Sequence, residues 1–385
     1  MEHKDFDVVV IGAGMAGASA AAEIARNRRV VLLERESQPG YHSTGRSAAL
    51  FSETYGNAVV RALTRASREF LYAPPQGFVE HPLVRTRGSL HIARNDQIAA
   101  LNAFFALPDV AAQARLVDAK EAKRLCALLR DGYAAAAILE PDAADVDVHA
   151  LHQGFLRQFR ARGGVLVTDA GVMALQRTPM GWGVRTAAGE FGAPVVVNAA
   201  GAWADEVASL AGLGQLGITP NRRTALLVDP PAGIDVDALP NTIDIEEQFY
   251  FKPDAGKLFL SPADETPSEP CDAQPDEMDV AVAIDRVQQA ADIDIRVVRR
   301  KWAGLRSFAP DRSPVIGYDE RAKGFFWLAG QGGYGIQTAP AAGVLVAALV
   351  NESAVPQALA AFGVTEAPLS PSRFTRQPYR EAAAR

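Results

Sequence analysis

The stretch over residues 7–40 constrains the fold more than any other part of the chain. Val8–Ile11 is an apolar run rich in β-branched residues, which predicts a fully buried strand. The run ends in GAGMAG at residues 12–17, and an alanine-rich stretch with high helix propensity follows. Val30–Leu33 is a second apolar run, closed by Glu34. This order of strand, glycine turn, helix, strand and acid predicts a dinucleotide-binding βαβ unit.

Each small residue of this unit has a physical role. Gly12 permits the tight turn, Gly14 lets a pyrophosphate approach the backbone, and Gly17 lets helix and strand pack closely. The phosphates are expected at the helix N-terminus, where free N–H groups and the helix dipole favour anions. Glu34 is placed to accept a hydrogen bond from a ribose hydroxyl, and an acid there argues against a 2′-phosphate. Both NAD and FAD satisfy this pattern.

Length and composition restrict the class of protein. The 385 residues suggest two domains, and 48% hydrophobic with 22% charged residues is ordinary for a globular protein. A net charge of −6 without long runs of one sign argues against a nucleic-acid partner. The two cysteines, Cys126 and Cys271, form no CxxC motif and suit a reducing compartment. No signal peptide or membrane-spanning run is recognisable, so we expect a cytoplasmic protein, with peripheral contact at the inner face of the membrane left open.

Two further buried strands also end in small residues. Val195–Asn198 runs into AAGAW, and Phe325–Ala329 runs into GQGGYG at residues 330–335, before a helix expected over 336–350. Together with residues 12–17, these loops stand at the start, middle and end of the chain. Small residues let a planar ligand lie close to the backbone, so the three loops favour a long ligand across one sheet edge. FAD fits that arrangement better than NAD.

The nucleotide-binding elements alternate with stretches that carry no cofactor signature. Strands expected over 248–252 and 295–302 and a helix over 278–291 belong to these stretches. We therefore predict an α/β fold with an α+β second domain, in which a Rossmann-like domain is interleaved with a mixed-sheet substrate domain. The expected boundaries are 1–85, 142–221 and 303–367 for the first domain, 86–141 and 222–302 for the second, and 368–385 for a polar, poorly ordered tail.

Several motifs together resemble the D-amino-acid oxidase-like flavoenzymes, the DAO family. They are VVVIGAGMAGASAA with ERE, QPGYHSTGRSAA, NAAGAWAD, WAGLRSFAPDRSPVIG and AGQGGYGIQTAP, and the resemblance extends to about Pro368. It is strongest to bacterial D-amino acid dehydrogenases of the D-arginine dehydrogenase type. The resemblance implies an FAD-binding domain of the glutathione-reductase type that holds FAD non-covalently.

The resemblance also assigns the FAD contacts. Residues 12–17 would hold the pyrophosphate, Glu34 the ribose, the backbone of Val172 the adenine, and residues 43–48 the flavin. A helix starting near Ile336 would point its N-terminus at flavin N1–O2, where reduction places negative charge. The predicted cofactor-binding residues are Gly12, Gly14, Ala16, Gly17, Glu34, Arg35, Ser43, Thr44, Gly45, Arg46, Ser47, Ala48, Val172, Ala200, Gly201, Trp203, Gly332, Gly333, Tyr334, Gly335, Ile336, Gln337 and Thr338.

On the substrate side, Arg306 and Tyr250 match the family's carboxylate clamp. An arginine fork binds a carboxylate bidentately, and a tyrosine hydroxyl can donate to the same group. Arg306 follows an expected strand, where an arginine is otherwise more often a surface ion-pair residue. Arg223, with Arg222 as the register alternative, and Tyr55 are the further catalytic candidates. Tyr55 matches a position on a mobile loop over the site, or else is a half-buried core tyrosine.

Leu50, Ser89 and Gly333 are the residues expected to line the substrate pocket. Relatives specialised for basic side chains have a histidine near Leu50 and a carboxylate near Ser89. A cationic side chain would lack its partner here, so we expect neutral or apolar D-amino acids in preference to D-arginine. Arg85 and Arg87 leave acidic substrates open.

The histidines predict no metal site. His149 and His152 lie three residues apart on an expected helix, without a third ligand in view. His42 lies in the flavin loop, where some relatives attach the flavin covalently, but a non-covalent binder is expected here.

The resemblance therefore implies FAD-dependent oxidative deamination of a D-amino acid. Arg306 and Tyr250 would pin the carboxylate, a hydride would move from Cα to flavin N5, and the imino acid would hydrolyse to a 2-oxo acid. Oxygen, a quinone or another acceptor would reoxidise the flavin. One alternative is a flavin oxidase or dehydrogenase of a secondary amine, of the glycine or sarcosine kind, or of a 2-hydroxy acid. A second is an FAD-binding subunit that only relays electrons.

Overall fold

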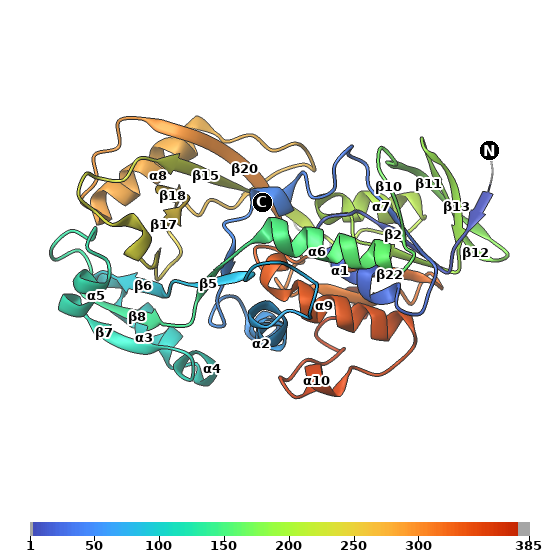
Figure 1. Cartoon of the computed structure of the whole chain (residues 1–385), viewed down its shortest axis with the longest axis horizontal. Helices are drawn as coiled ribbons and strands as arrows, with labels where there is room; N and C mark the ends of the chain where they lie inside the picture. The colour runs from blue at the N-terminus through green and yellow to red at the C-terminus, as the bar shows by residue number, and fades with distance from the viewer. Residues whose placement is uncertain (1–2, 376–385) are drawn as a thin grey trace, which may run out of the picture.

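The computed structural model describes residues 3–375 of the chain. Figure 1 shows the predicted nucleotide-binding elements gathered on one side and the interleaved elements, from β6 (Ser89–Ala93) to β8 (Ala136–Glu140) and from β15 (Thr219–Val228) to α8 (Glu277–Ala290), on the other. The predicted α/β fold with a mixed-sheet second region is confirmed.

The sheet that carries the βαβ unit has the strand order β10-β3-β2-β14-β22-β21. Its strands are parallel except β21, which closes one edge against β22. The strands are β2 (Val8–Ile11), β3 (Val30–Leu33), β10 (Val165–Val167), β14 (Val195–Asn198), β21 (Val315–Tyr318) and β22 (Phe325–Ala329). Because β2, β14 and β22 are parallel neighbours, the three loops that follow them lie together at the carboxyl ends of these strands.

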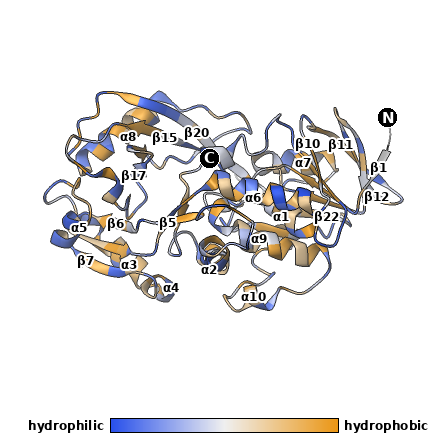
Figure 2. Ribbon diagram, viewed as in Figure 1, coloured by the Kyte–Doolittle hydropathy of each residue, from blue (hydrophilic) through white to orange (hydrophobic). Residues whose placement is uncertain are grey.

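Helices cover one face of this sheet. They are α1 (Met15–Ile24), α2 (Ala58–Tyr72), α6 (Val148–Ala161) and α9 (Gly335–Val350). Figure 2 shows α1 and α9 as largely hydrophobic. The two helices approach closely: a Cβ added to Gly343 would lie 2.9 Å from the Ser19 carbonyl oxygen.

The opposite face packs against α7 (Ala204–Leu210) and a small second sheet. The strand order of that sheet is β1 (His3–Asp5), β13 (Gly189–Ala193), β12 (Gly181–Thr186) and β11 (Val172–Thr178).

The large mixed sheet has the order β19-β15-β18-β17-β16-β6-β8-β7, and β20 also pairs with β15. Its strands are β6 (Ser89–Ala93), β7 (Arg115–Asp118), β8 (Ala136–Glu140), β15 (Thr219–Val228), β16 (Asn241–Asp244), β17 (Tyr250–Asp254), β18 (Lys257–Ser261), β19 (Thr266–Pro267) and β20 (Val298–Phe308). The helices around it are α3 (Ile98–Phe105), α4 (Pro108–Ala111), α5 (Ala119–Leu125) and α8 (Glu277–Ala290). A small sheet of β4 (Leu50–Phe51), β9 (Ala144–Val146) and β5 (Val84–Thr86) lies between the two regions.

The pairing of β15 with β20 decides which arginines share a face. Asn221 pairs with Arg306, Arg223 with Gly304, and Arg222 with Leu305. Since side chains alternate along a strand, Arg223 and Arg306 point to one face and Arg222 to the other. Arg222 indeed forms an ion pair with Asp279 of α8, at 2.8 Å.

Three expectations about element ends need correction or comment. The strand expected over 295–302 runs from Val298 to Phe308, so Arg306 lies inside β20 and not after it. Gly304 and the polar residues near the end of β20 obscured the strand pattern in the sequence.

The tail that was expected to be poorly ordered is structured in its first part. Leu369 is buried, its carbonyl accepts from the Ile316 N–H, and α11 (Ser372–Thr375) follows. Residues 376–385 lie outside the described residues. The predicted boundaries 85/86, 221/222 and 302/303 fall inside β5, β15 and β20.

Candidate active site

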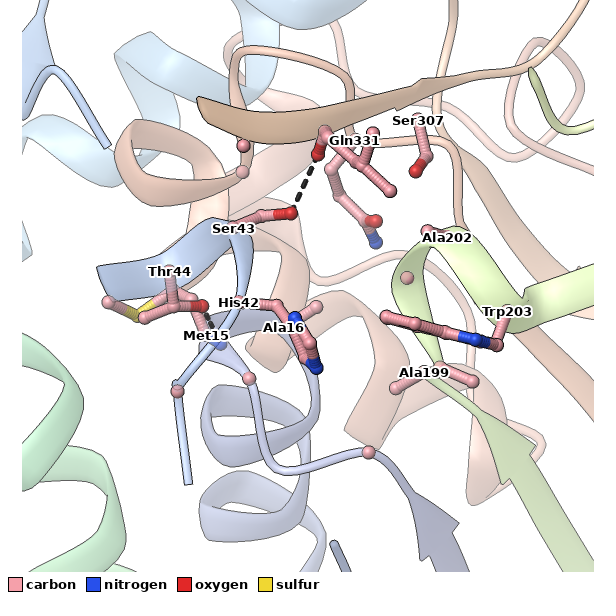
Figure 3. Close-up of a pocket in the computed structure, with 18 of the residues that line it drawn as sticks. Met15, Ala16, His42, Ser43, Thr44, Ala199, Ala202, Trp203, Ser307 and Gln331 are labelled. Carbon is pink, nitrogen blue, oxygen red and sulfur yellow. Dashed lines mark hydrogen bonds between the residues drawn. The ribbon is translucent and has the colours of Figure 1, made fainter. Parts of the chain in front are cut away.

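A cavity of about 660 Å³ lies where the loops after β2, β14 and β22 meet the mixed sheet. That volume is within the range of about 300–1,000 Å³ usual for small-molecule and cofactor sites. Figure 3 shows side chains from all these segments around it, among them Met15, Thr44, Trp203 and Gln331. The three small-residue loops therefore border one elongated cavity.

The first loop requires glycine at two positions. Gly12 has φ +99°, and a Cβ there would lie 2.5 Å from the Ala199 carbonyl oxygen. A Cβ on Gly17 would lie 1.8 Å from the Gly12 carbonyl oxygen. Helix α1 begins after Gly14 with no side-chain cap and no acid in its first turn. The Met15 N–H donates to Thr44 Oγ1 at 2.9 Å, so the remaining first-turn N–H groups and the positive end of the helix dipole are available to the cavity.

Glu34 lines the cavity and also holds the glycine loop. Its carboxylate accepts from the Ala13 N–H at 2.9 Å and from the Glu36 N–H at 3.0 Å. Burial raises the pKa of Glu34, although these backbone donors act in the opposite direction. The residue expected to bind a ribose thus has a second, structural function that the sequence motif does not reveal.

The 3₁₀ helix η1 (Ser43–Arg46) is tied to the mixed sheet across the cavity. Ser43 Oγ donates to the Leu305 carbonyl at 2.6 Å (Figure 3), and Arg46 donates to the carbonyls of Ala303 and Ala273. Arg46 also forms an ion pair with Asp272. The cavity is therefore closed by contacts between two segments more than 220 residues apart.

Aromatic and cationic side chains gather near η3 (Gly201–Trp203). The Arg35 guanidinium lies 4.6 Å from the centre of the Trp203 ring, and the His42 ring lies 4.7 Å from it on centroids. His42 Nε2 lies 2.9 Å from a Glu36 carboxylate oxygen. Val172 lines the same end of the cavity.

The opposite end of the cavity offers an unpaired donor. Gln331 Nε2 is buried and has no hydrogen-bond partner among residues 3–375. Its amide points into the cavity in Figure 3. Helix α9 begins just beyond it, after Tyr334, without a side-chain cap or a first-turn acid. A polar ligand would satisfy these free donors.

A second, smaller cavity of about 50 Å³ shares Arg306, Tyr250 and Arg223 with the first. Arg306 donates to the Tyr55 hydroxyl at 3.0 Å and to the Tyr250 hydroxyl at 3.4 Å. A Cβ on Gly333 would lie 2.9 Å from Arg306 Nη1, so this glycine makes room for the guanidinium. Arg306 forms no ion pair with a carboxylate of the described chain.

The other two cations of the small cavity do have carboxylate partners. Arg223 donates to Glu265 at 3.0 Å and to the Asp264 carbonyl at 2.7 Å. Lys252 Nζ donates to Asp145 at 2.6 Å. Within residues 3–375, Arg306 is therefore the cavity cation that forms no ion pair with a carboxylate, and the charge of Glu247 acts on it only from the cavity edge.

Arg306 and the two tyrosines beside it shift one another's pKa values. Burial lowers the pKa of Arg306, but the oxygens of Tyr55 and Tyr250 outweigh it and raise that pKa above its ordinary value. Burial raises the pKa of Tyr250, but the positive charges of Arg306 and Arg223 outweigh it, so the net pKa is lowered. For Tyr55 burial dominates, and the pKa is raised. Arg306 is thus a cation at any physiological pH.

Two buried side chains position the segment before Tyr55. Glu140 of β8 accepts from the Ser52 and Thr54 hydroxyls, each at 2.7 Å, and from the Glu53 N–H at 2.6 Å. Gln337 of α9 accepts from the Ser52 N–H at 3.1 Å and donates to its carbonyl at 3.2 Å. No motif identifies Glu140, and only its burial beside hydroxyl groups does.

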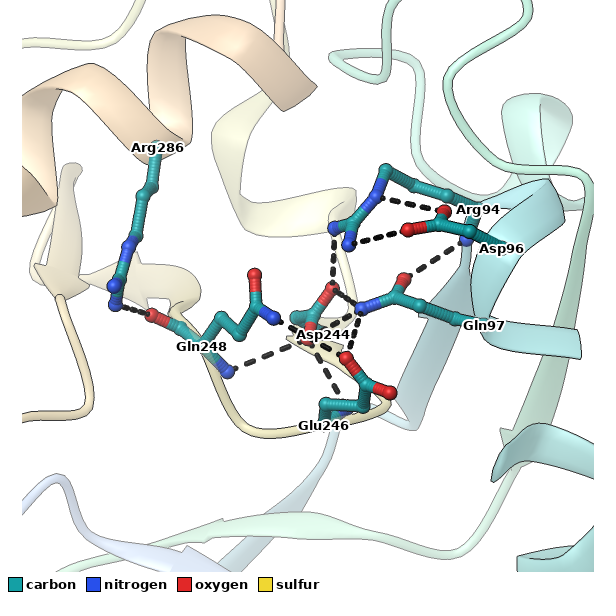
Figure 4. Close-up of polar contacts among 7 residues, drawn as sticks. All are labelled: Arg94, Asp96, Gln97, Asp244, Glu246, Gln248 and Arg286. Carbon is teal, nitrogen blue, oxygen red and sulfur yellow. Dashed lines mark hydrogen bonds and ion pairs between the residues drawn. The ribbon is translucent and has the colours of Figure 1, made fainter. Parts of the chain in front are cut away.

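The turn between β16 and β17 brings the carboxylate of Glu247 to the small cavity, and buried Asp244 holds this turn. Asp244 is fully buried and accepts from Gln97 and from the N–H groups of Glu246 and Gln248, as Figure 4 shows. This network fixes the turn, in which Glu247 has φ +55°. Glu247 is exposed at the cavity edge, and its charge contributes to raising the pKa values of Arg306, Tyr55 and Tyr334.

The structure distributes the predicted site residues as follows. Of the predicted cofactor residues, Gly17, Gly45, Tyr334, Gln337 and Thr338 do not line the large cavity, and the others do. Tyr334 packs edge-on against Tyr55, and Thr338 donates to the Tyr334 carbonyl. Leu50 and Gly333 line the small cavity. Ser89 lines neither; it is buried and accepts from Asn241 Nδ2 at 3.1 Å.

The remaining sequence candidates have structural contacts. His152 is buried in α6, with Nε2 2.9 Å from the Ala13 carbonyl oxygen. Burial lowers the pKa of His152. Cys126 is buried and Cys271 exposed, and both are free. In the described part of the chain, no cluster of His, Cys, Asp and Glu could hold a metal ion. No helix there is long and apolar enough to cross a bilayer.

Comparison with known proteins agrees with this architecture. Residues 7–349 match the family described as FAD dependent oxidoreductase, DAO. Glycine oxidase of Geobacillus kaustophilus is 25% identical over 379 residues, covering 95% of this chain and 98% of the relative. Its crystal structure superposes with a TM-score of 0.84 at 22% identity, over 98% of this chain and all of the other.

Two further solved structures share the fold. L-proline dehydrogenase from P. horikoshii gives a TM-score of 0.80 at 23% identity, covering 97% of this chain and 99% of that one. Iminodiacetate oxidase from Chelativorans sp. BNC1 gives 0.75 at 23% identity, covering 90% and 96%.

The fold, the cavity and the family match together define a flavoprotein oxidoreductase. The chain belongs to the DAO family of FAD-dependent oxidoreductases, and its cofactor is FAD.

Proposed function

We propose that the chain oxidises the amine of an α-amino acid whose carboxylate is bound by Arg306. The observation that carries this proposal is the position of Arg306 where the two cavities meet, with tyrosine partners but no carboxylate partner. A half-buried cation without a carboxylate paired to it is costly, and a substrate carboxylate supplies that partner bidentately.

The residues of the large cavity fit FAD. The N-terminus of α1, where Thr44 Oγ1 accepts from the Met15 N–H, leaves its other first-turn N–H groups for the pyrophosphate. The free Gln331 Nε2 and the N-terminus of α9 suit the polar edge of the flavin. When bound, FAD supplies the two-electron oxidation of the C–N bond. The chain's own residues then bind the carboxylate, orient the substrate and exclude water.

Arg306 and Tyr250 would fix the carboxylate, while Tyr55 covers the small cavity. The positive charge of Arg306 favours the form of the substrate that carries an ionised carboxylate and an unprotonated amine. That form is the one that can be oxidised. Tyr250 and Tyr55 are therefore assigned to binding and orientation, and no proton transfer is assigned to either.

The first substrate candidate is glycine or a secondary amine of the glycine kind. The similar proteins are named for glycine, L-proline and iminodiacetate, each of which carries a carboxylate beside the carbon that bears the amine. A second candidate is a D-amino acid, the substrate class of the sequence resemblance. The small cavity beyond Arg306 favours it, because glycine has no substituent to place there.

The test is anaerobic mixing of the FAD-loaded protein with glycine, sarcosine, L-proline, and pairs of D- and L-amino acids, with flavin bleaching as the readout. Arg306→Ala should lower kcat/KM by about 10²–10⁴, from two charge-assisted hydrogen bonds of about 1.5–3 kcal/mol each. FAD content should be unchanged, and Arg306→Lys should recover part of the loss. Arg299→Ala, an exposed arginine paired with Asp229, is the matched control. Unchanged kinetics in Arg306→Ala would refute the assignment.

A protein that binds FAD yet bleaches with no amine or 2-hydroxy acid would instead be an electron-relay subunit. Oxygen consumption compared with dye or quinone reduction then distinguishes oxidase from dehydrogenase activity.

A further inference from the structure

Positive charge exceeds negative charge at the inner wall of the small cavity. Lys252 lines this cavity, and its ammonium is paired with Asp145. The other oxygen of the same carboxylate is bound by Arg87 at 2.5 Å. The side chains of Lys252 and Arg87 are only 5% and 6% exposed. Within the described residues neither has another carboxylate, so one negative charge faces two buried positive charges.

The ammonium also retains donor capacity. A lysine has three N–H donors, and Asp145 is the acceptor found for Lys252 among residues 3–375. Beside it, Asn241 is 1% exposed and lines the same cavity, with its amide donating to Ser89. Buried positive charge with spare donors is the chemistry of an anion site.

We propose that this wall is a second anion subsite, in which Lys252 and Asn241 receive a second carboxylate of the substrate. The inference rests on the proposed function, because Arg306 takes the first carboxylate. The preferred substrates are then amino dicarboxylates, with the second carboxylate on the Cα side chain or on the amine nitrogen.

The cavity also limits the length of the substituent. Its volume is about 50 Å³, which suits a carboxymethyl group and not a long side chain. The competing carboxylate, Glu247, stands on an exposed turn at the cavity edge, and its charge acts on the side of Arg306, Tyr55 and Tyr334. Lys252 and Arg87 share the single carboxylate of Asp145, and the positive charge left over on this wall therefore sets the substrate charge that the subsite prefers. This proposal departs from the expectation of neutral or apolar substrates drawn from Leu50 and Ser89, and takes up the acidic substrates that Arg85 and Arg87 left open.

The test compares acids with their neutral isosteres on the FAD-loaded protein. D-aspartate is paired with D-asparagine, and iminodiacetate with N-(carbamoylmethyl)glycine. We expect kcat/KM for flavin bleaching to favour the acid by about tenfold or more in at least one pair, which equals about 1.4 kcal/mol. The pair that shows the preference identifies where the second carboxylate sits. Equal use of acid and amide in both pairs would overturn the proposal, even if glycine bleaches the flavin.

Lys252→Met supplies the matched variant. It removes the excess charge but leaves Asp145 paired with Arg87, so no buried carboxylate is orphaned. The ratio of acid to amide should fall to about one in Lys252→Met and be retained in Lys252→Arg. Lys257→Met removes a lysine outside both cavities, paired with Asp229, and should leave the ratio unchanged. A ratio that survives in Lys252→Met refutes the subsite.

A binding experiment separates this proposal from the proposed function. Succinate and succinamate are titrated against the flavin absorbance spectrum, which needs no turnover. Tighter binding of succinate that is lost in Lys252→Met supports the subsite, even if no amine bleaches the flavin. Equal binding of the two probes counts against it.

Discussion

Glu140 offers a sharp test of how the active-site segment before Tyr55 is held. Glu140→Leu introduces an apolar side chain of similar size and removes the acceptors of Ser52, Thr54 and the Glu53 N–H. The two hydroxyls lie 3.2 Å apart and can still pair with each other. The Glu53 N–H is left buried without its partner, which costs about 1–3 kcal/mol, and one lost hydroxyl bond adds about 0.5–1.5 kcal/mol. We therefore expect the free energy of unfolding to fall by about 1.5–4.5 kcal/mol.

Glu140→Gln is the matched control, because its carbonyl oxygen can still accept from the Glu53 N–H while the hydroxyls accept from its amide. The assay is denaturant unfolding of the FAD-loaded protein, followed by tryptophan and flavin fluorescence, with KM for the best amine as a second readout. Glu140→Leu should also raise KM, because Tyr55 is displaced from Arg306. Equal stability of the two variants would refute the reasoning.

The pH dependence provides an independent check on Glu140. Burial raises its pKa in the folded protein above the value of about 4.3 expected when unfolded. The folded state therefore holds the proton more tightly, and this contribution to stability is fully present below the unfolded pKa. It is lost as pH rises through the folded pKa. The stability of wild type relative to Glu140→Gln should fall between acidic and neutral pH, and a constant or rising difference would contradict the burial argument.

Three further outcomes follow from the geometry. Gly12→Ala should abolish FAD incorporation, measured by the ratio of flavin to protein absorbance, because its Cβ would lie 2.5 Å from the Ala199 carbonyl oxygen. Asp272→Ala breaks the ion pair with Arg46 across the cavity and should speed FAD release on dilution, measured by flavin fluorescence, with kcat at saturating FAD little changed. Tyr250→Phe should lower kcat/KM by about tenfold, from one lost hydrogen bond to a charged group, and any alkaline limb of the pH profile should move upward, because the pKa of Tyr250 is lowered.

Local patterns of the sequence predict the cofactor side of the molecule well. The βαβ unit, the strand Phe325–Ala329 and the helix after it are found where their apolar runs and glycines indicate. These features depend on residues close together in the chain, such as Gly12 and Gly17. Predictions were weaker where pairing between distant strands decides the structure. β20 extends six residues beyond the expected end at Trp302 because β15 is there to pair with it.

The substrate side shows why a list of charged residues is not yet a site. Arg223, Lys252 and Arg306 are all visible in the sequence, and although the family resemblance singles out Arg306, no local pattern shows which of the three lacks a carboxylate partner. The partners that do distinguish them, Glu265 and Asp145, are 42 and 107 residues away in the chain. Only tertiary pairing leaves Arg306 without a carboxylate and leaves Asp145 shared. Substrate charge is therefore set by which cations remain uncompensated after folding, and substitutions at the partner carboxylates should alter specificity as strongly as substitutions of the cations themselves.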